Sequence, residues 1–215
     1  MQDETSSQDL NERLTLIESM IAEGRRSTES WGWTFLLWGV AYYVAIAWAS
    51  WGGHLSVRGR AYMITESFWS GLAWPVTMIC AVILTLAIGL RKGRARPGTT
   101  ITRAVVSIWC CMGISMFLLF PAFALSGRLD EHAFVAIVAG MLGIANGASG
   151  LILKWRAQII CAVVWWITSA LACFGTIAQL TAVFLIAIFL CQIVFGIYTM
   201  VQESRRRGQR GVVHA

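Results

Sequence analysis

The sequence is poor in charged residues, proline and histidine. Only 13% of its 215 residues are charged, three are proline and three are histidine, whereas 57% are hydrophobic. A soluble globular protein has about 25% charged residues, and a disordered chain has far less apolar content, so both classes are excluded. The six cysteines lie inside apolar runs without the spacing of a zinc or redox site, so no cofactor is expected. The composition is that of a membrane protein.

Six stretches are long and apolar enough to cross a bilayer as helices, which takes about 20 residues each. These stretches are 31–52, 67–90, 104–125, 133–153, 157–176 and 180–201. The last two are separated only by a turn expected near Gly175. We therefore expect an all-α polytopic membrane protein with six transmembrane helices over 29–202. A short cytoplasmic amphipathic helix over 1–28 precedes this bundle, and a basic cytoplasmic tail over 203–215 follows it.

Lys and Arg are divided unequally between the two sides of such a bundle. One side holds 14 of them, with three in 1–30, five in 91–103, two in 154–156 and four in 203–215. The other side holds three, namely Arg58, Arg60 and Arg128. By the positive-inside rule, both termini are expected in the cytoplasm, with the protein in a cell inner membrane. The basic loops favour membrane lipids with anionic headgroups, and no nucleic acid partner is expected.

Four apolar residues near the N-terminus recur at spacings of 4, 3 and 4, and they are Leu10, Leu14, Ile17 and Ile21. This spacing places them on one stripe of a helix expected to run from Gln8 to Gly24. Residues 1–30 hold seven acidic and three basic side chains, whereas a helix that lies on an anionic membrane is usually rich in Lys and Arg. The stripe is therefore expected to contact protein: the basic loops of its own bundle, a second copy in a homo-oligomer, or another membrane protein.

No Asp, Glu, Lys, Arg or His falls in the middle of an expected span. Proton relays, ion-coupled transporters and carboxylate enzymes usually need such a group inside the membrane, so an enzyme is not expected. The deepest strongly polar side chains are the amides of Asn146 and Gln192, with the hydroxyl of Ser149 near them. A hydrogen bond between the two amides is the first interpretation, because hydrocarbon offers few other partners, and contact with a ligand is the alternative.

Two expected spans carry faces of small residues, which allow another helix to approach closely. Gly140, Gly143, Gly147 and Gly150 form one face, and Ala41, Ala45 and Ala49 form the other.

The segment from Gly147 to Gly150 resembles the GxSG motif of rhomboid intramembrane proteases, over four residues, with Ser149 as the nucleophile. Such a protease needs a histidine to take the serine proton, and none occurs from Ala133 to Val213. His132 should lie about 25 Å away at 1.5 Å per residue, so a protease is a remote hypothesis. His54 and His132 lack a ligand spacing, so no metal site is predicted, although metal binding at the outer side stays open.

The stretch from Leu14 to Ile21, followed by Trp33 to Gly39, resembles a group of small bacterial integral membrane proteins with no known activity. These proteins begin with a similar helix and have an F-L-x-W-G element in their first span, so the resemblance implies placement in a bacterial inner membrane. The alanine face also resembles that of the S-components of energy-coupling-factor transporters, where it meets the coupling subunit.

The sequence as a whole is compatible with two functions. The first is a non-enzymatic regulator or assembly subunit acting through protein or lipid contacts, and the alternative is a small-molecule or lipid binder of transporter type.

Overall fold

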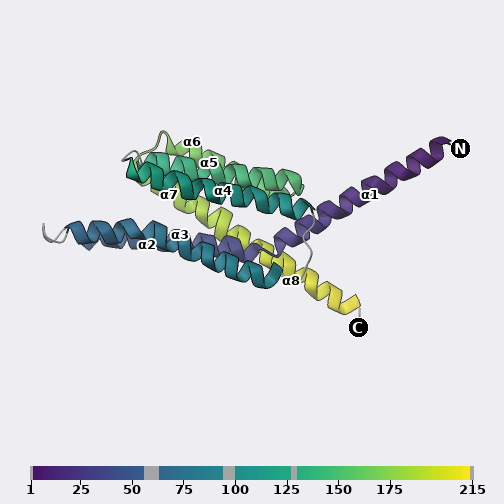
Figure 1. Ribbon diagram of the computed structural model, residues 1–215, viewed down its shortest axis with the longest axis horizontal. Helices are drawn as coiled ribbons and strands as arrows, with labels where there is room; N and C mark the ends of the chain where they lie inside the picture. The colour runs from purple at the N-terminus through teal and green to yellow at the C-terminus, as the bar shows by residue number, and fades with distance from the viewer. Residues whose placement is uncertain (1, 56–62, 94–99, 127–129, 214–215) are drawn as a thin grey trace.

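A computed structural model describes residues 2–55, 63–93, 100–126 and 130–213, and all elements in these ranges are helical. The elements are α1 (Gln2–Glu29), α2 (Gly32–Leu55), α3 (Met63–Gly93), α4 (Thr100–Leu125), α5 (Glu131–Ile152), α6 (Arg156–Ala172), α7 (Ile177–Ile188), the π-helix η2 (Phe189–Val194) and α8 (Phe195–Val213). The prediction of an all-α fold is confirmed for these ranges (Figure 1).

Within the described ranges, five helical segments are long and apolar enough to cross a membrane. They are Gly32–Trp51, Gly71–Arg91, Thr100–Phe123, Glu131–Ile152 and Ile177–Arg205. The span expected over 157–176 corresponds to α6, which has only 17 residues, fewer than the about 20 that usually cross a bilayer core. The difference arises because α6 ends at Ala172 and the following turn begins there.

A capping box sets the start of α7 in this turn. The backbone N–H of Gln179 donates to the hydroxyl of Thr176 at 3.4 Å, and the Thr176 N–H donates to the Gln179 side chain at 3.0 Å. These two bonds satisfy amide groups that the first turn of a helix leaves unpaired. The turn therefore lies beside Gly175, where the sequence predicts it, but α7 begins at Ile177 rather than at residue 180.

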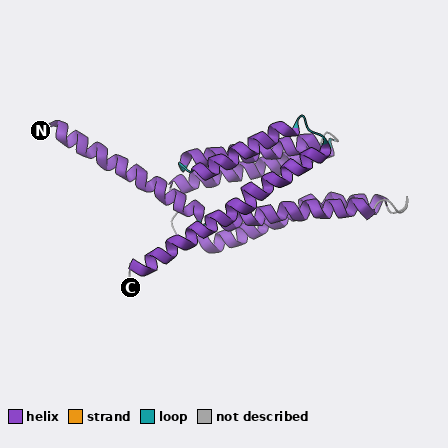
Figure 2. Ribbon diagram, turned by 180° about the vertical axis from the view of Figure 1, so that it is seen from behind, coloured by secondary structure: helices purple, strands orange, loops and turns teal. Residues whose placement is uncertain are grey.

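The helices form two groups with a long helical rod between them. The pair α2 and α3 forms one group, and α4, α5 and α6 form the other (Figure 1). The segments α7, η2 and α8 follow one another without a break, and we call them the central rod. The central rod crosses between the groups and contacts α5 and α6 on one side and α2 on the other (Figure 2).

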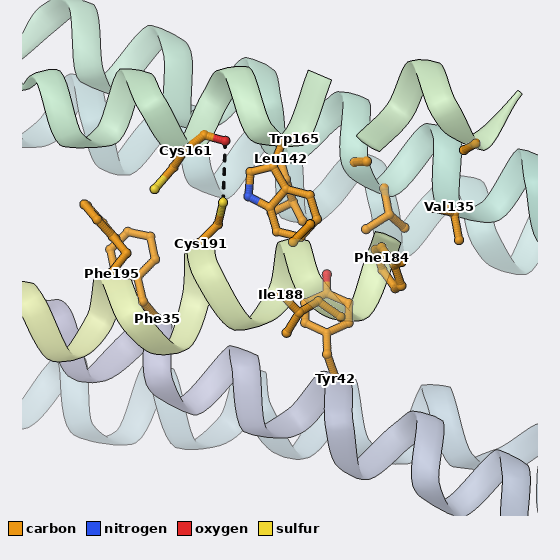
Figure 3. Close-up of a cluster of buried hydrophobic side chains, with 14 of the residues drawn as sticks. Phe35, Tyr42, Val135, Leu142, Cys161, Trp165, Phe184, Ile188, Cys191 and Phe195 are labelled. Carbon is orange, nitrogen blue, oxygen red and sulfur yellow. Dashed lines mark hydrogen bonds between the residues drawn. The ribbon is translucent and has the colours of Figure 1, made fainter. Parts of the chain in front are cut away.

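The inner face of the central rod carries the core of the molecule, with Phe184, Ile188, Cys191 and Phe195 buried. The ring of Phe195 meets that of Phe35 edge-on, with centroids 4.9 Å apart, whereas Phe184 packs between aromatic rings from both groups (Figure 3). The core therefore joins the two groups through side chains of the rod.

The π-helix η2 lies in the middle of the central rod. Just before it, the hydroxyl of Tyr43 donates to the backbone carbonyl of Leu185 at 2.9 Å. A side chain that bonds into the helical ladder is one cause of a local change in helix geometry. The wider π-turn, with its i to i+5 hydrogen bonds, leaves both Cys191 and Gln192 buried.

Glycines bring α2 and the central rod into close contact. A Cβ atom at Gly196 would lie 3.0 Å from the carbonyl oxygen of Gly32 and 3.1 Å from the backbone nitrogen of Leu36. A Cβ atom at Gly39 would lie 2.8 Å from the Cβ of Gln192. Backbones approach this closely only where small residues meet, and such contacts drive helix association in lipid.

The four glycines predicted to form a packing face lie between α5 and α6. A Cβ atom at Gly143 would lie 2.5 Å from Nε1 of Trp166, and one at Gly147 would lie 3.0 Å from the same indole. At the two ends of the face, Gly140 approaches Ser169 and Gly150 approaches Ile159. The indole of Trp166 therefore fills the space that the middle glycines leave.

A tight turn at Lys154 joins α5 to α6. The N–H of Trp155 donates to the carbonyl of Gly150 at 2.8 Å, and the N–H of Lys154 donates to that of Leu151 at 3.2 Å. Lys154 has φ of 49°, the left-handed conformation that usually ends a helix in this motif. This turn reverses the chain so that α6 returns directly along the glycine face of α5.

We expect Gly143→Ala to destabilise the protein by about 1–3 kcal/mol, because the new methyl group would overlap the Trp166 indole. The matched control is Gly113→Ala in α4, where a Cβ atom would meet nothing within 4 Å. The control should be neutral or stabilising by up to about 1 kcal/mol, since alanine favours helix. Thermal unfolding in detergent measures both variants, and equal melting temperatures would contradict the packing of Gly143 against Trp166.

Candidate functional site

Among the described residues, helix α1 contacts the rest of the molecule near its C-terminal end. Gly24 is buried, and a Cβ atom there would lie 2.7 Å from Ile101 at the start of α4 and 3.4 Å from Leu153 at the end of α5. The helix also contacts α8. It continues past Gly24 to Glu29, so the prediction that it ends at Gly24 is wrong. The reason is that Gly24 fits a close helix contact, and α-helices accept glycine at such positions.

The N-terminal part of α1 projects away from the bundle (Figure 1). Three residues of the predicted stripe are more than half exposed, with 61% for Leu10 and 52% each for Leu14 and Ile17, whereas Ile21 is partly buried. Among the described residues, therefore, nothing covers this outer part of the stripe. A row of exposed apolar residues on one helix face is a candidate contact surface.

The two amides singled out in the sequence are both buried, but they are not hydrogen-bonded to each other. The side-chain NH₂ of Asn146 donates to the carbonyl of Leu142 in its own helix at 2.8 Å. The Asn146 Oδ1 and the Gln192 Oε1 have no hydrogen-bond partner among the described residues. The expected bond across the helices is thus replaced by a bond within α5, because a short amide side chain reaches the carbonyl four residues before it.

Two further buried polar side chains were not singled out in the sequence. Gln158 in α6 is fully buried, with neither amide atom bonded to a described residue, and the same holds for the indole N–H of Trp165. Gln158 lies two residues after Arg156 at the start of α6, so the sequence indicates a residue at the membrane boundary. Its burial comes from the tight turn at Lys154, which brings the first turn of α6 against α5.

The hydroxyl of Ser149 accepts a hydrogen bond from the indole N–H of Trp109 at 3.1 Å. An indole N–H is a donor only and cannot take a proton from the serine. His132 lies at the opposite end of α5, with Nε2 at 3.1 Å from the carbonyl oxygen of Gly175. The geometry therefore does not bring His132 to Ser149. The hydrogen bond from Trp109 is a contact between packed helices.

The alanine face of α2 is only partly accessible. Ala45 is fully buried, whereas Ala41 and Ala49 are partly buried. A partner protein could not reach Ala45 without displacing its present neighbours. The glycines that α2 uses for close contact, Gly32 and Gly39, were not identified in the sequence.

Within the described ranges, no group of three or more His, Cys, Asp or Glu residues could hold a metal ion. The side chain of His54, one of the two histidines considered for a metal, lies outside the described side chains. The two buried cysteines belong to the core, where the Cys191 thiol donates to the carbonyl of Cys161 at 3.7 Å (Figure 3). This contact suits thiols that pack as small apolar groups.

The chain matches no family model, no curated protein and no solved structure. Its function is therefore inferred from the exposed stripe of α1 and from the buried polar side chains.

We expect Gln158→Met to stabilise the protein by about 1–3 kcal/mol, because the substitution removes a buried amide that has no described partner while it keeps the side-chain length. The control is Gln202→Met, where the amide is bonded to the exposed hydroxyl of Tyr198 and little change is expected. Thermal unfolding in detergent is the measurement. A lower melting temperature for Gln158→Met would show that the buried amide has a stabilising partner.

Proposed function

We propose that this chain is a non-enzymatic regulator or assembly subunit of the membrane that presents α1 to another protein chain as a contact helix. The observation that carries the proposal is the geometry of α1, which is docked at Gly24 and exposes Leu10, Leu14 and Ile17 beyond the bundle. A helix fixed at one end presents its free part in a defined direction, which lowers the entropic cost of binding.

A bundle of six spans is part of the proposal, with α6 as a short fifth crossing. Its support is the antiparallel packing of α6 on α5. Ile159 lies against Gly150 near one end of α5, and the Ser169 hydroxyl donates to the carbonyl of Ala136 near the other end at 2.8 Å. Because α5 is itself long enough to cross a membrane, a helix that follows it over this length crosses most of the same depth.

A cytoplasmic location of both termini, in a cell inner membrane, completes the proposed topology. The contact of Gly24 with Ile101 and Leu153 brings α1, the end of the 91–103 segment and the 154–156 turn to one end of the molecule. These segments carry most of the Lys and Arg residues, as cytoplasmic segments do. The basic residues assigned to the other side, Arg58, Arg60 and Arg128, lie outside the described residues.

The charges of α1 support a protein rather than a lipid surface as its partner. Glu12 and Glu23 lie on the side of the helix opposite the stripe by the 3.6-residue period. A helix that lies on an anionic membrane needs a basic polar face to attract the headgroups. Lipid acyl chains are instead the proposed neighbours of α3 and α4, which expose large apolar residues such as Leu90 and Leu118.

Small-molecule binding is the second candidate function. It is favoured by the buried amide oxygens of Asn146, Gln158 and Gln192, which have no described partner. A neutral polar ligand would supply the missing hydrogen bonds, since unpaired amides are costly inside hydrocarbon. The resemblance to transporter S-components gains no support at the alanine face, because Ala45 is fully buried.

The topology predicts that a reporter active only in the cytoplasm gives signal when it is fused to either terminus. The same reporter inserted beside Arg60 or Arg128 should give none, because loops with few basic residues favour the outer side. Signal from an export-dependent reporter at the C-terminus would mean that α6 does not cross the membrane. The number of spans would then be five.

The contact function predicts that a photo-crosslinking residue in place of Ile17 forms an adduct with a protein chain in native membranes. The matched control is the same residue in place of Leu16, which is 61% exposed but lies off the stripe. We expect far fewer adducts from the control position, measured as mass-shifted bands and by mass spectrometry. Equal adducts from both positions, or adducts with lipid alone, would contradict the proposal.

A further inference from the structure

The spacing and charges along the exposed part of α1 identify the chain that it contacts. We propose that the partner is a second copy of this chain, joined through a parallel two-helix coiled coil along the stripe. This inference rests on the proposed contact function and names its partner. It combines three observations: the exposed stripe, the charges beside it, and the docking of α1 on a membrane-embedded bundle.

The stripe has the spacing of a coiled-coil seam. With Leu14 and Ile21 at positions a of a heptad, Leu10 and Ile17 occupy positions d. The next d position is Gly24, which is packed against Ile101 of the same chain. The seam therefore begins where the contact with the bundle ends, and its N-terminal part is exposed.

The charged residues beside the seam are placed to form ion pairs between two parallel helices. In this register Arg13 occupies position g and Glu18 occupies position e, on opposite sides of the stripe. In a parallel coiled coil, a residue at g faces the residue five positions later at e of the other helix. Arg13 of each copy would therefore face Glu18 of the other copy, so that the dimer contains two pairs of opposite charge.

The other acidic residues between Leu10 and Gly24 do not oppose the pairing. Glu12 and Glu23 occupy positions f and c, which point away from the seam. These two carboxylates therefore lie on the outer faces of the two helices. This placement matters because exposed charges more than about 8 Å apart are largely screened at physiological salt.

The bilayer fixes the direction of the two helices. Two copies inserted with the same topology are related by a two-fold axis along the membrane normal, so their α1 helices leave the membrane on the same side and with the same sense. The docked end at Gly24 holds the seam from Leu10 to Ile21 at the surface of the bundle. Confinement in one membrane also raises the effective concentration of the second copy.

The first test uses two copies of the full chain with different affinity tags, expressed together and purified from membranes in mild detergent through one tag. The wild-type chain should retain the second tag. Leu14→Asp with Ile17→Asp should lower the retained amount at least about tenfold, because the carboxylates would lose hydration in the seam. Leu16→Asp, at the equally exposed position c, should retain the wild-type amount.

A charge exchange tests the parallel register. Glu18→Arg should lower the retained amount on the order of two- to fivefold at low salt, because Arg13 would then face an arginine. Adding Arg13→Glu to Glu18→Arg should restore it, since the opposite charges face each other again. Absence of this restoration, with every variant as thermally stable as the wild type, would overturn the parallel pairing.

Crosslinking separates the failure of this inference from that of the proposed function. A photo-crosslinking residue in place of Leu14 should give an adduct of twice the chain mass, containing only peptides of this chain. An adduct with a different protein would overturn the second copy as partner while the contact function stands. Adducts with lipid alone, or no adduct, would overturn both.

Discussion

The structure depends on how closely its helices approach one another inside the membrane. In lipid there is little hydrophobic force between apolar helices, so they associate where small side chains permit extensive contact. The central rod makes such a close contact at Gly196, which lies against the backbone of α2 at Gly32. Its opposite side contacts α5 and α6, so the rod joins two groups of helices that follow one another in the chain.

The docking of α1 follows from the same kind of contact at the end of the bundle. Gly24 allows the helix to reach Ile101 and Leu153, so two different spans hold its last turns. The direction in which the exposed stripe points is therefore set by the transmembrane bundle. A rearrangement of α4 relative to α5 would change that direction, which connects the membrane-embedded helices to the surface that α1 presents.

The sequence predicts the features that depend on local patterns. Composition and run length indicate the apolar helices, and the glycine spacing indicates the face of α5 at Gly143 and Gly147. It does not reveal the pairing of Gly32 with Gly196, because neither belongs to a local repeat and they are far apart in the chain. The burial of Gln158 is also hidden, since it depends on a tight turn whose left-handed residue is a lysine rather than a glycine.

The π-helix takes up extra chain length within the central rod without changing what the rest of the rod contacts. One residue added to or removed from an α-helix rotates everything beyond it by about 100°. The turn at Phe189–Val194 contains more residues than an α-helical turn, and beyond it Phe195 and Gly196 still face the neighbouring helices. Loss of one residue within this segment would therefore restore a plain α-helical turn and keep the contacts of Phe195 and Gly196, whereas a deletion elsewhere in the rod would rotate both residues away from their neighbours.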